Sequence, residues 1–475
     1  MTEVRSAASS GVGLFATRAF AVGDVILEHE SPLIVLSAQD ELASSSFLSF
    51  APTGRRKQET PPSIWESIVP PPSIPPHQMG NFRGMVQAAV SYAQQPNSDH
   101  SKLFQLYRPT STSQDEKEVL QVSNEALSYL EQNSKGALKD LITNNPDKVL
   151  AVMLIWSCNA FEGGIIYEKH SRINHSCNPN AVIQTNKETQ CVRAAAPINV
   201  GDEITISYLG IFLYADRPTR REQLHKHKQF VCTCERCQAD PDIAAAIPCP
   251  SCHKRQGRYL EEDVQYDDES TVHYAIPSTP TSVVCSHCQE TTTLDNKNPN
   301  HVLQLARTVS AKVVTQFEKE QRDEGEEEWE EQLLQLASSV LGARHWTTNL
   351  LLLKSLDRRL KVLSADMIMT GNPPELMQVA ELIDSLERLC RFVGELGLQL
   401  HIGHLLGNVV IGVARTLVSL GDMKSKKYAL EWSQKVNDFV ENFESNDMKK
   451  VVATIQAAWQ KEEEEQGSNK RAKLS

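Results

Sequence analysis

Three cysteines within six residues, Cys232, Cys234 and Cys237, constrain this chain more than any other feature of its sequence. The spacing C-x-C-x2-C brings three thiols into one tight loop, and tetrahedral zinc needs four ligands. The chain has 11 cysteines, none before Cys158, and no segment typical of a secretory signal. We therefore expect a reducing compartment, the nucleus or the cytoplasm, in which clustered cysteines bind metal rather than form disulfides. The loop predicts a zinc site whose fourth ligand lies elsewhere in the sequence.

Two further cysteine pairs, Cys249 with Cys252 and Cys285 with Cys288, each have C-x2-C spacing. Together they predict a second site of four thiolates, although His253 or His287 could replace one of them. We interpret residues 245–295 as an inserted zinc ribbon with a structural or partner-binding role. The sequence thus predicts about two Zn²⁺ ions per chain if both sites are filled.

The charge balance is acidic, with 48 Lys and Arg against 60 Asp and Glu. A general nucleic-acid binder usually has a basic surface, so nucleic acid is not the partner we expect. No apolar stretch is long enough for a transmembrane helix, and no membrane partner is expected. The basic segment Arg217–Lys228 is more typical of a solvated helix face than of a phosphate site. The basic residues Lys470 to Lys473 are more typical of a polar tail than of a nuclear localisation signal.

Local patterns divide the chain into segments. Residues 1–40 have the pattern of strands, with Gly23-Asp24 as a turn. Residues 51–80 are rich in proline, which disfavours both helix and central strand. Residues 84–145 have a helical pattern with a cap at Ser123, and an apolar helix follows at 147–156. Short strands are expected around residues 182–183, 191–193 and 203–207, and helical hairpins from about 300 to 461.

Three motifs follow one another in the second quarter of the chain. They are NHSCNPN at Asn174–Asn180, GDEITISY at Gly201–Tyr208 and FVCTCERC at Phe230–Cys237. With the segment Ser10–Ile34 and the CNAF of Cys158–Phe161, they make this sequence resemble a SET-domain protein, most closely the SET and MYND domain family. The resemblance covers residues 4–36 and 150–237 and, less specifically, 300–460.

The resemblance implies an α+β multidomain protein. It would comprise a β-rich SET fold with a pseudoknot, a zinc-binding post-SET segment and an α-helical, tetratricopeptide-like C-terminal domain. The boundaries we expect are 1–50 and 146–215 for the two parts of the SET domain, 51–145 for a proline-rich and helical insertion, 216–240 for the post-SET segment, 245–295 for the ribbon, 300–461 for the helical domain and 462–475 for a disordered tail.

The implied activity is S-adenosylmethionine-dependent methylation of lysine side chains in a histone or non-histone protein. The helical domain would bind partner proteins. The resemblance makes Tyr208 the catalytic residue and Cys177 the fourth ligand of the first zinc site. The positions that match cofactor-binding residues of the family are Gly11, Val12, Gly13, Asn159, Asn174, His175, Tyr208 and Phe230. Without the motifs, plain packing would explain Tyr208 at a strand end and Phe230 in a core.

The sequence departs from the family pattern at several positions. Residues 37–150 contain no cysteine, so we expect the MYND zinc finger to be absent. Lys228 stands where the family often has an aromatic residue of the lysine channel, and Gly210 where it usually has an acidic or polar one. Tyr214 is a candidate replacement for the channel wall. These changes keep open a second hypothesis, a catalytically inactive SET scaffold that binds protein partners.

Overall fold

The computed structural model describes residues 1–7, 11–28, 30–36, 68–75, 78–95, 100–109, 117–161, 164–186, 189–255, 273–279, 281–293, 302–318, 326–370, 372, 374–398 and scattered positions from 412 to 460. They belong to two compact units. The first unit comprises Met1–Ala21, Val25–Gly210 and Arg221–Cys232, and the second comprises Val22–Asp24, Ile211–Arg220 and Thr233–Ser475. Among the described helices, none combines the length and the apolar character that crossing a bilayer requires.

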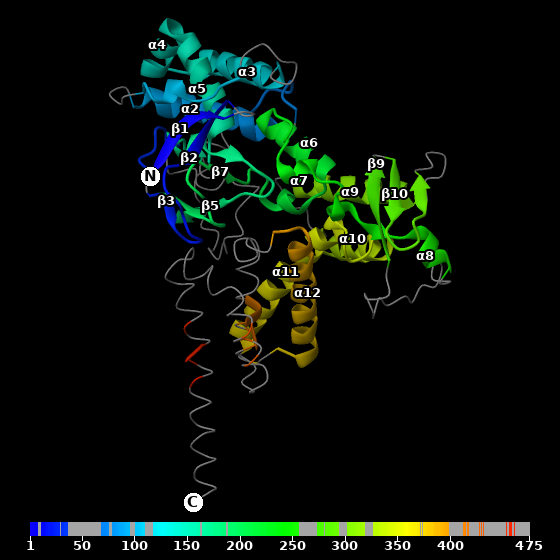
Figure 1. Ribbon diagram of the computed structural model, residues 1–475. Helices are drawn as coiled ribbons and strands as arrows, with labels where there is room; N and C mark the ends of the chain where they lie inside the picture. The colour runs from blue at the N-terminus through cyan, green and yellow to red at the C-terminus, as the bar shows by residue number, and fades with distance from the viewer. Residues whose placement is uncertain are drawn as a thin grey trace, which may run out of the picture. The chain divides into compact units, whose positions relative to one another are not determined.

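Two small sheets form the β-rich part of the first unit (Figure 1). One has the order β1-β2-β7-β4, and the other has the order β3-β6-β5. The strands are β1 (Thr2–Ala7), β2 (Gly11–Ala16), β3 (Val25–Leu27), β4 (Asn174–His175), β5 (Ala181–Asn186), β6 (Thr189–Ala194) and β7 (Glu203–Ile206). The strands β1, β2, β3, β5, β6 and β7 lie where the sequence predicted strands. β4 was not named in advance, and residues 30–36 contain an isolated bridge at Ile34 rather than a strand.

The register of β7 explains how this sheet buries a core. β7 pairs antiparallel with β2 and parallel with β4. Along β7, Ile204 and Ile206 are buried, whereas Glu203 and Thr205 remain partly exposed. This alternation is the period of two that a strand with one buried face requires. Ile204 and Ile206 pack in one cluster with residues such as Leu14, Phe20 and Val192.

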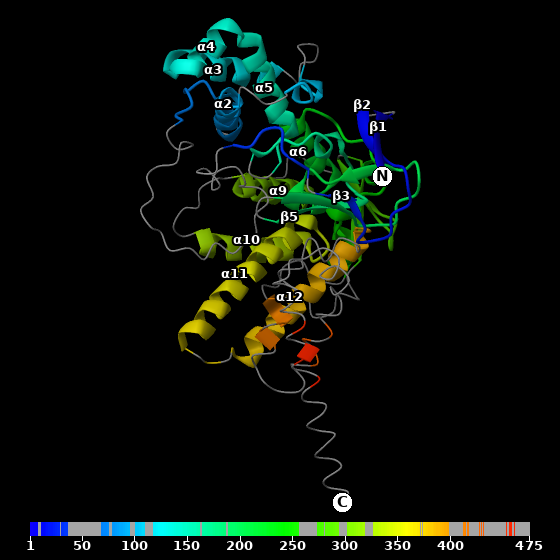
Figure 2. The same ribbon diagram turned by 90° about the vertical axis from the view of Figure 1, so that its left-hand side faces the viewer.

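Four helices of the first unit pack on one another beside the sheets (Figures 1 and 2). They are α2 (Met79–Ala93), α3 (Lys117–Asn133), α4 (Gly136–Asn144) and α5 (Pro146–Asn159). α5 is buried along most of its length, as its apolar sequence predicted, and Pro146 is in its first turn, where a missing N–H costs nothing. Gly84 of α2 lets Trp156 of α5 approach, since a Cβ on Gly84 would lie 1.8 Å from the indole.

Two details of the expected insertion are corrected. Ser123 does not cap a helix, because it lies inside α3 and its hydroxyl donates to the carbonyl of Leu120 at 2.8 Å. A mid-helix serine commonly bonds back to the preceding turn in this way. The helical part begins at Met79 rather than at residue 84. Most of the proline-rich segment lies outside the described residues.

The second unit contains a four-stranded sheet followed by helices. The strand order is β11-β10-β9-β8. The elements are α7 (Glu235–Gln238), β8 (Ile247–Pro248), α8 (Pro250–Arg255), β9 (Tyr274–Thr279), β10 (Ser282–Cys285), β11 (Thr291–Thr293), α9 (Val302–Glu318), α10 (Glu326–Leu341), α11 (Trp346–Thr370) and α12 (Leu376–Glu395). The helical pattern expected from about residue 300 is therefore found in the described part of that region.

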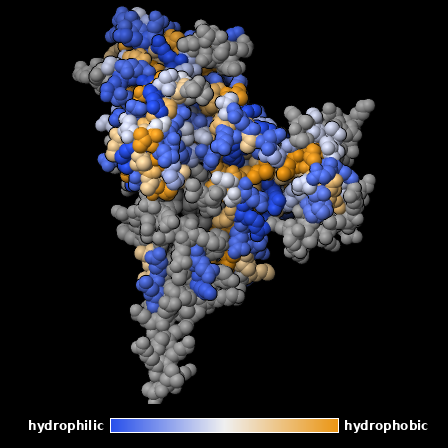
Figure 3. All heavy atoms as spheres, in the orientation of Figure 1, coloured by the Kyte–Doolittle hydropathy of each residue, from blue (hydrophilic) through white to orange (hydrophobic). Residues whose placement is uncertain are grey.

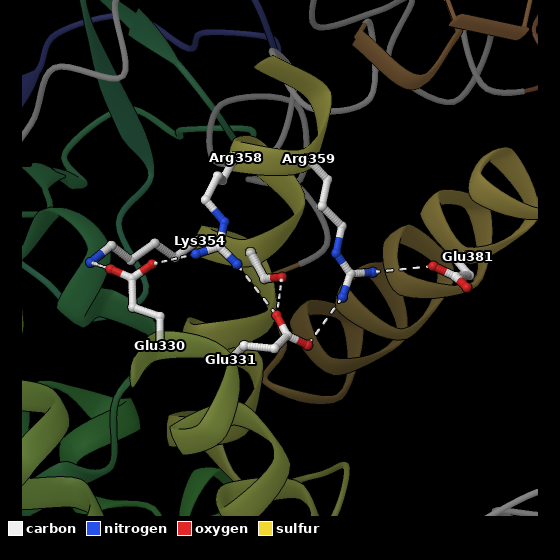
Figure 4. A network of polar contacts seen from close by, with 7 residues as sticks. Glu330, Glu331, Lys354, Arg358, Arg359 and Glu381 are labelled. Carbon is white, nitrogen blue, oxygen red and sulfur yellow. Dashed lines mark hydrogen bonds and ion pairs between the residues drawn. The ribbon is translucent and has the colours of Figure 1, made fainter. Parts of the chain in front are cut away.

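Ion pairs join α10 to α11 and α11 to α12 in this helical region (Figure 4). Glu331 of α10 reaches Arg358 at 3.3 Å and Arg359 at 3.4 Å, both on α11. Arg359 also reaches Glu381 of α12 at 3.7 Å. Glu330 pairs with Lys354. A network that shares its members among several charges holds its geometry better than one exposed pair does.

The remaining short elements link these parts. They are the helix α6 (Arg217–Lys228) and the 3-10 turns η3 (Leu103–Gln105), η5 (His170–Arg172), η6 (Gly210–Tyr214) and η7 (Ile243–Ala245). In the segment Arg217–Lys228, which was expected to be a solvated face, Glu222, His225 and His227 are exposed. Its arginines and lysines are not: Arg220 is fully buried and the other four are half-buried, so the prediction holds only in part. Hydrophilic side chains also cover much of the outer face of the α2–α5 helices in the view of Figure 3.

Candidate active site

The candidate active site lies where β4 and β7 end side by side in the first unit. Asn174 and His175 pair with Thr205 and Ile206, and Tyr208 follows two residues after β7. Asn180 fixes this pairing: its side chain donates to the carbonyl of Glu203 at 2.8 Å and accepts the N–H of Thr205 at 2.8 Å. Two motifs about 30 residues apart thereby become neighbours in space.

His175 connects Tyr208 to a cysteine. The backbone N–H of Tyr208 donates to Nδ1 of His175 at 3.0 Å. Because Nδ1 accepts, a neutral ring carries its proton on Nε2, which lies 3.3 Å from the sulfur of Cys177. The ring centres of His175 and Tyr208 are 5.3 Å apart. The imidazole therefore positions the Tyr208 backbone through a hydrogen bond, as well as packing against its ring.

The hydroxyl of Tyr208 donates a short hydrogen bond to the carbonyl oxygen of Ile173. Burial, and after it the negative charges that Glu203 and Cys158 can carry, raise the pKa of Tyr208 well above its usual value. The phenol therefore stays protonated at neutral pH and acts as a hydrogen-bond donor and dipole. It is not a base in this environment.

The start of β2 contacts the same site through Asn174. The side-chain amide of Asn174 donates to the carbonyl of Val12 at 3.1 Å and to Glu203 at 2.6 Å. A Cβ on Gly13 would lie 2.5 Å from Glu203 Oε1 and 2.9 Å from Asn174 Nδ2, so a larger residue would displace these two hydrogen-bonded side chains. Gly11 is different: its φ is +79°, and nothing lies within 4 Å of the place of a Cβ. The backbone of Gly11 and the exposed Val12 thus leave an open edge.

Phe230 and Lys228 come to the site from the end of α6. The Phe230 ring centre is 6.0 Å from that of His175 and 6.4 Å from that of Tyr208, at right angles to the latter. The Lys228 ammonium lies 5.5 Å from the centre of the Tyr208 ring and donates to the carbonyl of Cys158 at 3.1 Å. Burial lowers the pKa of Lys228, although the Cys158 thiol opposes this shift.

Asn159, predicted to bind a cofactor, lies buried at the end of α5. Its amide nitrogen donates to the carbonyls of Tyr107 at 2.8 Å and Ile155 at 2.7 Å. Both donors of the amide are thus used inside the chain, and the backbone carbonyl of Asn159 accepts the Ser171 hydroxyl at 3.4 Å, which leaves the amide oxygen for a ligand. Tyr214, considered as a channel wall, belongs to the second unit, where its ring packs on Phe392 at 6.4 Å between centres.

Glu30 is a site-building residue that sequence reasoning missed. Its carboxylate accepts the N–H groups of Lys169 and His170 at 2.9 Å and 3.2 Å, and contacts Nδ1 of the buried His170 at 2.8 Å. Burial alone would raise the pKa of Glu30, but these hydrogen bonds and the charge of His170 lower it overall. The contacts hold η5, which leads into Ile173 and Asn174. The role of Glu30 is visible only from its contacts with Lys169 and His170 in the structure, because a single glutamate after a strand matches no sequence motif.

The predicted cysteine ligands form two clusters. The sulfur atoms of Cys177, Cys232, Cys234 and Cys237 lie within 4.8 Å of one another, as do those of Cys249, Cys252, Cys285 and Cys288. In the second cluster, Cys249 is 3.6 Å from Cys288 and Cys252 is 3.9 Å from Cys285.

These sulfur distances fit a metal ion rather than disulfides. A disulfide needs about 2.05 Å, whereas zinc with four thiolates at about 2.3 Å separates the sulfurs by about 3.8 Å. Both clusters could therefore hold a metal ion. The alternative ligand His287 instead stacks on His273 with ring centres 3.5 Å apart, while the side chain of His253 lies outside the described residues.

Comparison with known proteins identifies the domain that contains the paired strands β4 and β7. Residues 11–209 match the model of the SET domain family. The chain contains a SET domain. The match includes β4, β7 and Tyr208, whereas Lys228, Phe230 and all cysteines of the two clusters except Cys177 follow it.

Curated relatives of this SET domain match over short stretches. Human histone-lysine N-methyltransferase SMYD3 is 42% identical over 84 residues, which are 17% of this chain and 19% of the relative. A putative SET domain-containing protein, L678, of Acanthamoeba polyphaga mimivirus is 29% identical over 30% of this chain and 56% of its own length. Chicken protein-lysine N-trimethyltransferase SMYD5 is 32% identical over 23% of this chain and 26% of its own length. The chain thus spans between a fifth and somewhat over half of these relatives.

Proposed function

We propose that this SET domain transfers methyl groups from S-adenosylmethionine to lysine side chains of a protein substrate. One observation carries the proposal: the protonated phenol of Tyr208 lies beside the Asn174–His175 pair and is hydrogen-bonded through its backbone to His175. The names of SMYD3 and SMYD5, both lysine methyltransferases, support it. The substrate could be a histone or another protein.

The residues of the site fit the proposed cofactor. The open edge at Gly11 and Val12 admits a ligand close to the backbone, and the ring of Phe230 offers a face for an adenine. When bound, S-adenosylmethionine supplies a methyl group on a positively charged sulfur. Gly13, Asn159, Asn174 and His175 would shape the cofactor pocket. Of these, Gly13 and the side chain of Asn174 would shape the pocket indirectly, because their contacts hold the start of β2 against β4.

The chain's own residues would orient the reacting groups. Methyl transfer needs a neutral amine in line with the methyl group and little acid–base work beyond the loss of one ammonium proton. Tyr208 keeps its proton, so its hydroxyl can direct a dipole at the reacting atoms rather than remove a proton. The carbonyls of Ile173 and Cys158 add acceptors that favour a donor or a positive charge nearby.

Zinc would complete the two cysteine clusters. Four thiolates are the ligand set of structural zinc, and such sites contribute directly to folding. In the first cluster, zinc on Cys177 would hold the sulfur that faces His175. In the second, it would join α8 to the end of β10, as expected for a zinc ribbon.

Other features of the whole protein are also proposals. We propose that the segments follow the domain boundaries expected from the sequence, that the helices after residue 300 form a tetratricopeptide-like surface for partner proteins, and that the protein acts in the nucleus or the cytoplasm. A second function, a catalytically inactive scaffold, is favoured by one observation: a lysine ammonium already lies over the ring of Tyr208.

The proposed activity can be tested without knowing the substrate. The full chain is incubated with a soluble cell extract and tritium-labelled S-adenosylmethionine, and labelled proteins are identified by mass spectrometry. Methyl groups on lysine in the wild type, and their absence with Tyr208→Phe, would support transfer. Tight binding of the labelled cofactor with no labelled protein would support the scaffold. Absence of cofactor binding would contradict both functions.

A further inference from the structure

Lys228 has contacts that an external amine would also seek. Its ammonium lies over the ring of Tyr208 at 5.5 Å from the centre, and the carbonyl of Cys158 accepts its hydrogen bond at 3.1 Å. An aromatic face and a carbonyl oxygen both attract a lysine ammonium. Under the proposed function, an acceptor amine must come to the same side chain, Tyr208.

The Lys228 ammonium lies at the C-terminal end of α5. Cys158 is in the last turn of α5, where carbonyls lack partners inside the helix, and a cation is favoured there by the helix dipole. Within the described part of the chain, the charged and titratable groups that face the Lys228 ammonium are the Cys158 thiol on α5 and the Tyr208 phenol after β7. Neither is a carboxylate, and the phenol is uncharged at neutral pH, so no carboxylate among them offsets the lysine charge.

A positive charge at this place discriminates between two forms of an acceptor. A protonated amine that approaches Tyr208 meets a like charge in a partly buried environment, where screening by water is weak. A neutral amine meets no such repulsion. Methyl transfer uses the neutral form: the nitrogen lone pair forms the N–C bond, the S–C bond breaks with its electrons remaining on sulfur, and the ammonium proton has already left to water.

We propose that Lys228 is a specificity-determining residue of the acceptor site, whose charge beside Tyr208 disfavours a protonated amine and selects the neutral amine. This inference rests on the proposed methyl transfer. Nearby cations lower the pKa of catalytic amines in other enzymes by the same physics. Here the effect falls on the amine of the substrate.

The matched variants are Lys228→Met, which removes the charge at similar length, and Lys228→Arg, which keeps it. Lys226→Met removes one charge from the same helix two residues earlier and serves as the control. Initial rates of methyl transfer to the most strongly labelled extract protein are measured from pH 6 to pH 10. Binding of labelled S-adenosylmethionine and thermal unfolding of the full chain are measured for each variant.

For Lys228→Met, we expect the kcat profile to move to higher pH by about one unit, so that kcat falls about tenfold at pH 7. KM should fall at least as much, because the protonated acceptor then binds without repulsion. Lys228→Arg and Lys226→Met should keep the wild-type profile. A purely structural role for Lys228 as a cation at the end of α5 would instead lower kcat/KM and the melting temperature without moving the profile, and would overturn the inference.

An equilibrium measurement gives a second readout. Peptides around the labelled lysine, carrying either lysine or uncharged norleucine, are titrated onto the wild type and Lys228→Met. The ratio of lysine to norleucine affinity should rise about tenfold in Lys228→Met, and an unchanged ratio would overturn the inference. If the wild type binds the cofactor but labels no protein, the proposed function fails and takes this inference with it. If proteins are labelled but Lys228→Met changes neither the pH profile of kcat nor the ratio of lysine to norleucine affinity, only the inference fails.

Discussion

His175 holds Tyr208 by its backbone: the Tyr208 N–H donates to Nδ1 of the imidazole at 3.0 Å, while Nε2 faces the sulfur of Cys177 at 3.3 Å. A histidine with one acceptor and one donor nitrogen is well suited to bridge two such groups. The bridge explains how a cysteine that never contacts the reacting atoms can affect the placement of the phenol. It also assigns the imidazole a positioning role.

The bridge predicts different effects for two substitutions of His175. Leucine leaves the Tyr208 N–H without its acceptor, which should cost about 1–3 kcal/mol of stability. Asparagine can place its side-chain oxygen near the position of Nδ1 and should recover a large part of that loss. Thermal unfolding and binding of labelled S-adenosylmethionine measure both effects. Equal losses for His175→Leu and His175→Asn would show that the hydrogen bond to Tyr208 matters little.

The position of the Tyr208 phenol predicts that its loss lowers the rate of methyl transfer without weakening cofactor binding. Tyr208→Phe removes the hydroxyl and its hydrogen bond to Ile173 but keeps the ring. We expect the methyl-transfer rate to fall about 100-fold or more, as when one positioned donor is lost, with cofactor affinity nearly unchanged. Tyr214→Phe is the control, because its buried hydroxyl has no hydrogen-bond partner among the described residues. A full rate in Tyr208→Phe would exclude the assigned catalytic role.

The cysteine clusters predict the metal content of the protein. The purified wild type should contain about two zinc ions per chain, and Cys285→Ser should contain about one. The same variant should speed amide hydrogen exchange in β10 and its partner strand β9, because the metal would link the end of β10 to α8. Cys390→Ser changes a cysteine outside both clusters and should keep the wild-type metal content. Elemental analysis by mass spectrometry measures the count, and two zinc ions in Cys285→Ser would contradict the assignment.

The Glu30 contacts predict how stability depends on pH. Glu30 has a lower pKa in the folded protein than in the unfolded chain, so its contribution is present above the unfolded value of about 4.3 and is lost as pH falls through the folded value. Glu30→Gln should therefore lower the melting temperature at pH 6 and matter progressively less toward pH 3. Parallel melts of the two proteins over this range test it. A difference that grows on acidification would have the wrong sign.

Local pattern was enough to predict most strands of the SET domain and the helices of both units. The alternation of polar and apolar residues in β7 and the apolar run of α5 are visible in the local sequence alone, without knowledge of which segments they contact. The cap at Ser123 was wrong because the pattern does not distinguish a serine that begins a helix from one that bonds back within it. The start of α2 was missed for a similar reason: the preceding prolines hide where the helix begins.

The candidate site was less predictable, because most of its contacts are between distant residues. Nothing around Glu30 indicates that it would accept two N–H groups 140 residues later in the chain. The motif around Asn159 suggested a ligand contact, yet its amide donors are used by Tyr107 and Ile155. A motif identifies residue types and order, whereas the partners of each polar atom depend on how segments pack.

The sequence by itself determined the chemistry available to this protein: seven cysteines in metal-binding spacing, the Asn174–His175 pair, a tyrosine after a strand and an aromatic residue before a cysteine loop. Only the tertiary structure decided that His175 would hold the Tyr208 backbone and that the Lys228 ammonium would lie over the same ring. The physical reason is that spacing along a chain constrains neighbours within a turn or two, whereas a parallel pairing such as β4 with β7 is stabilised by long-range burial and hydrogen bonds that no local segment contains.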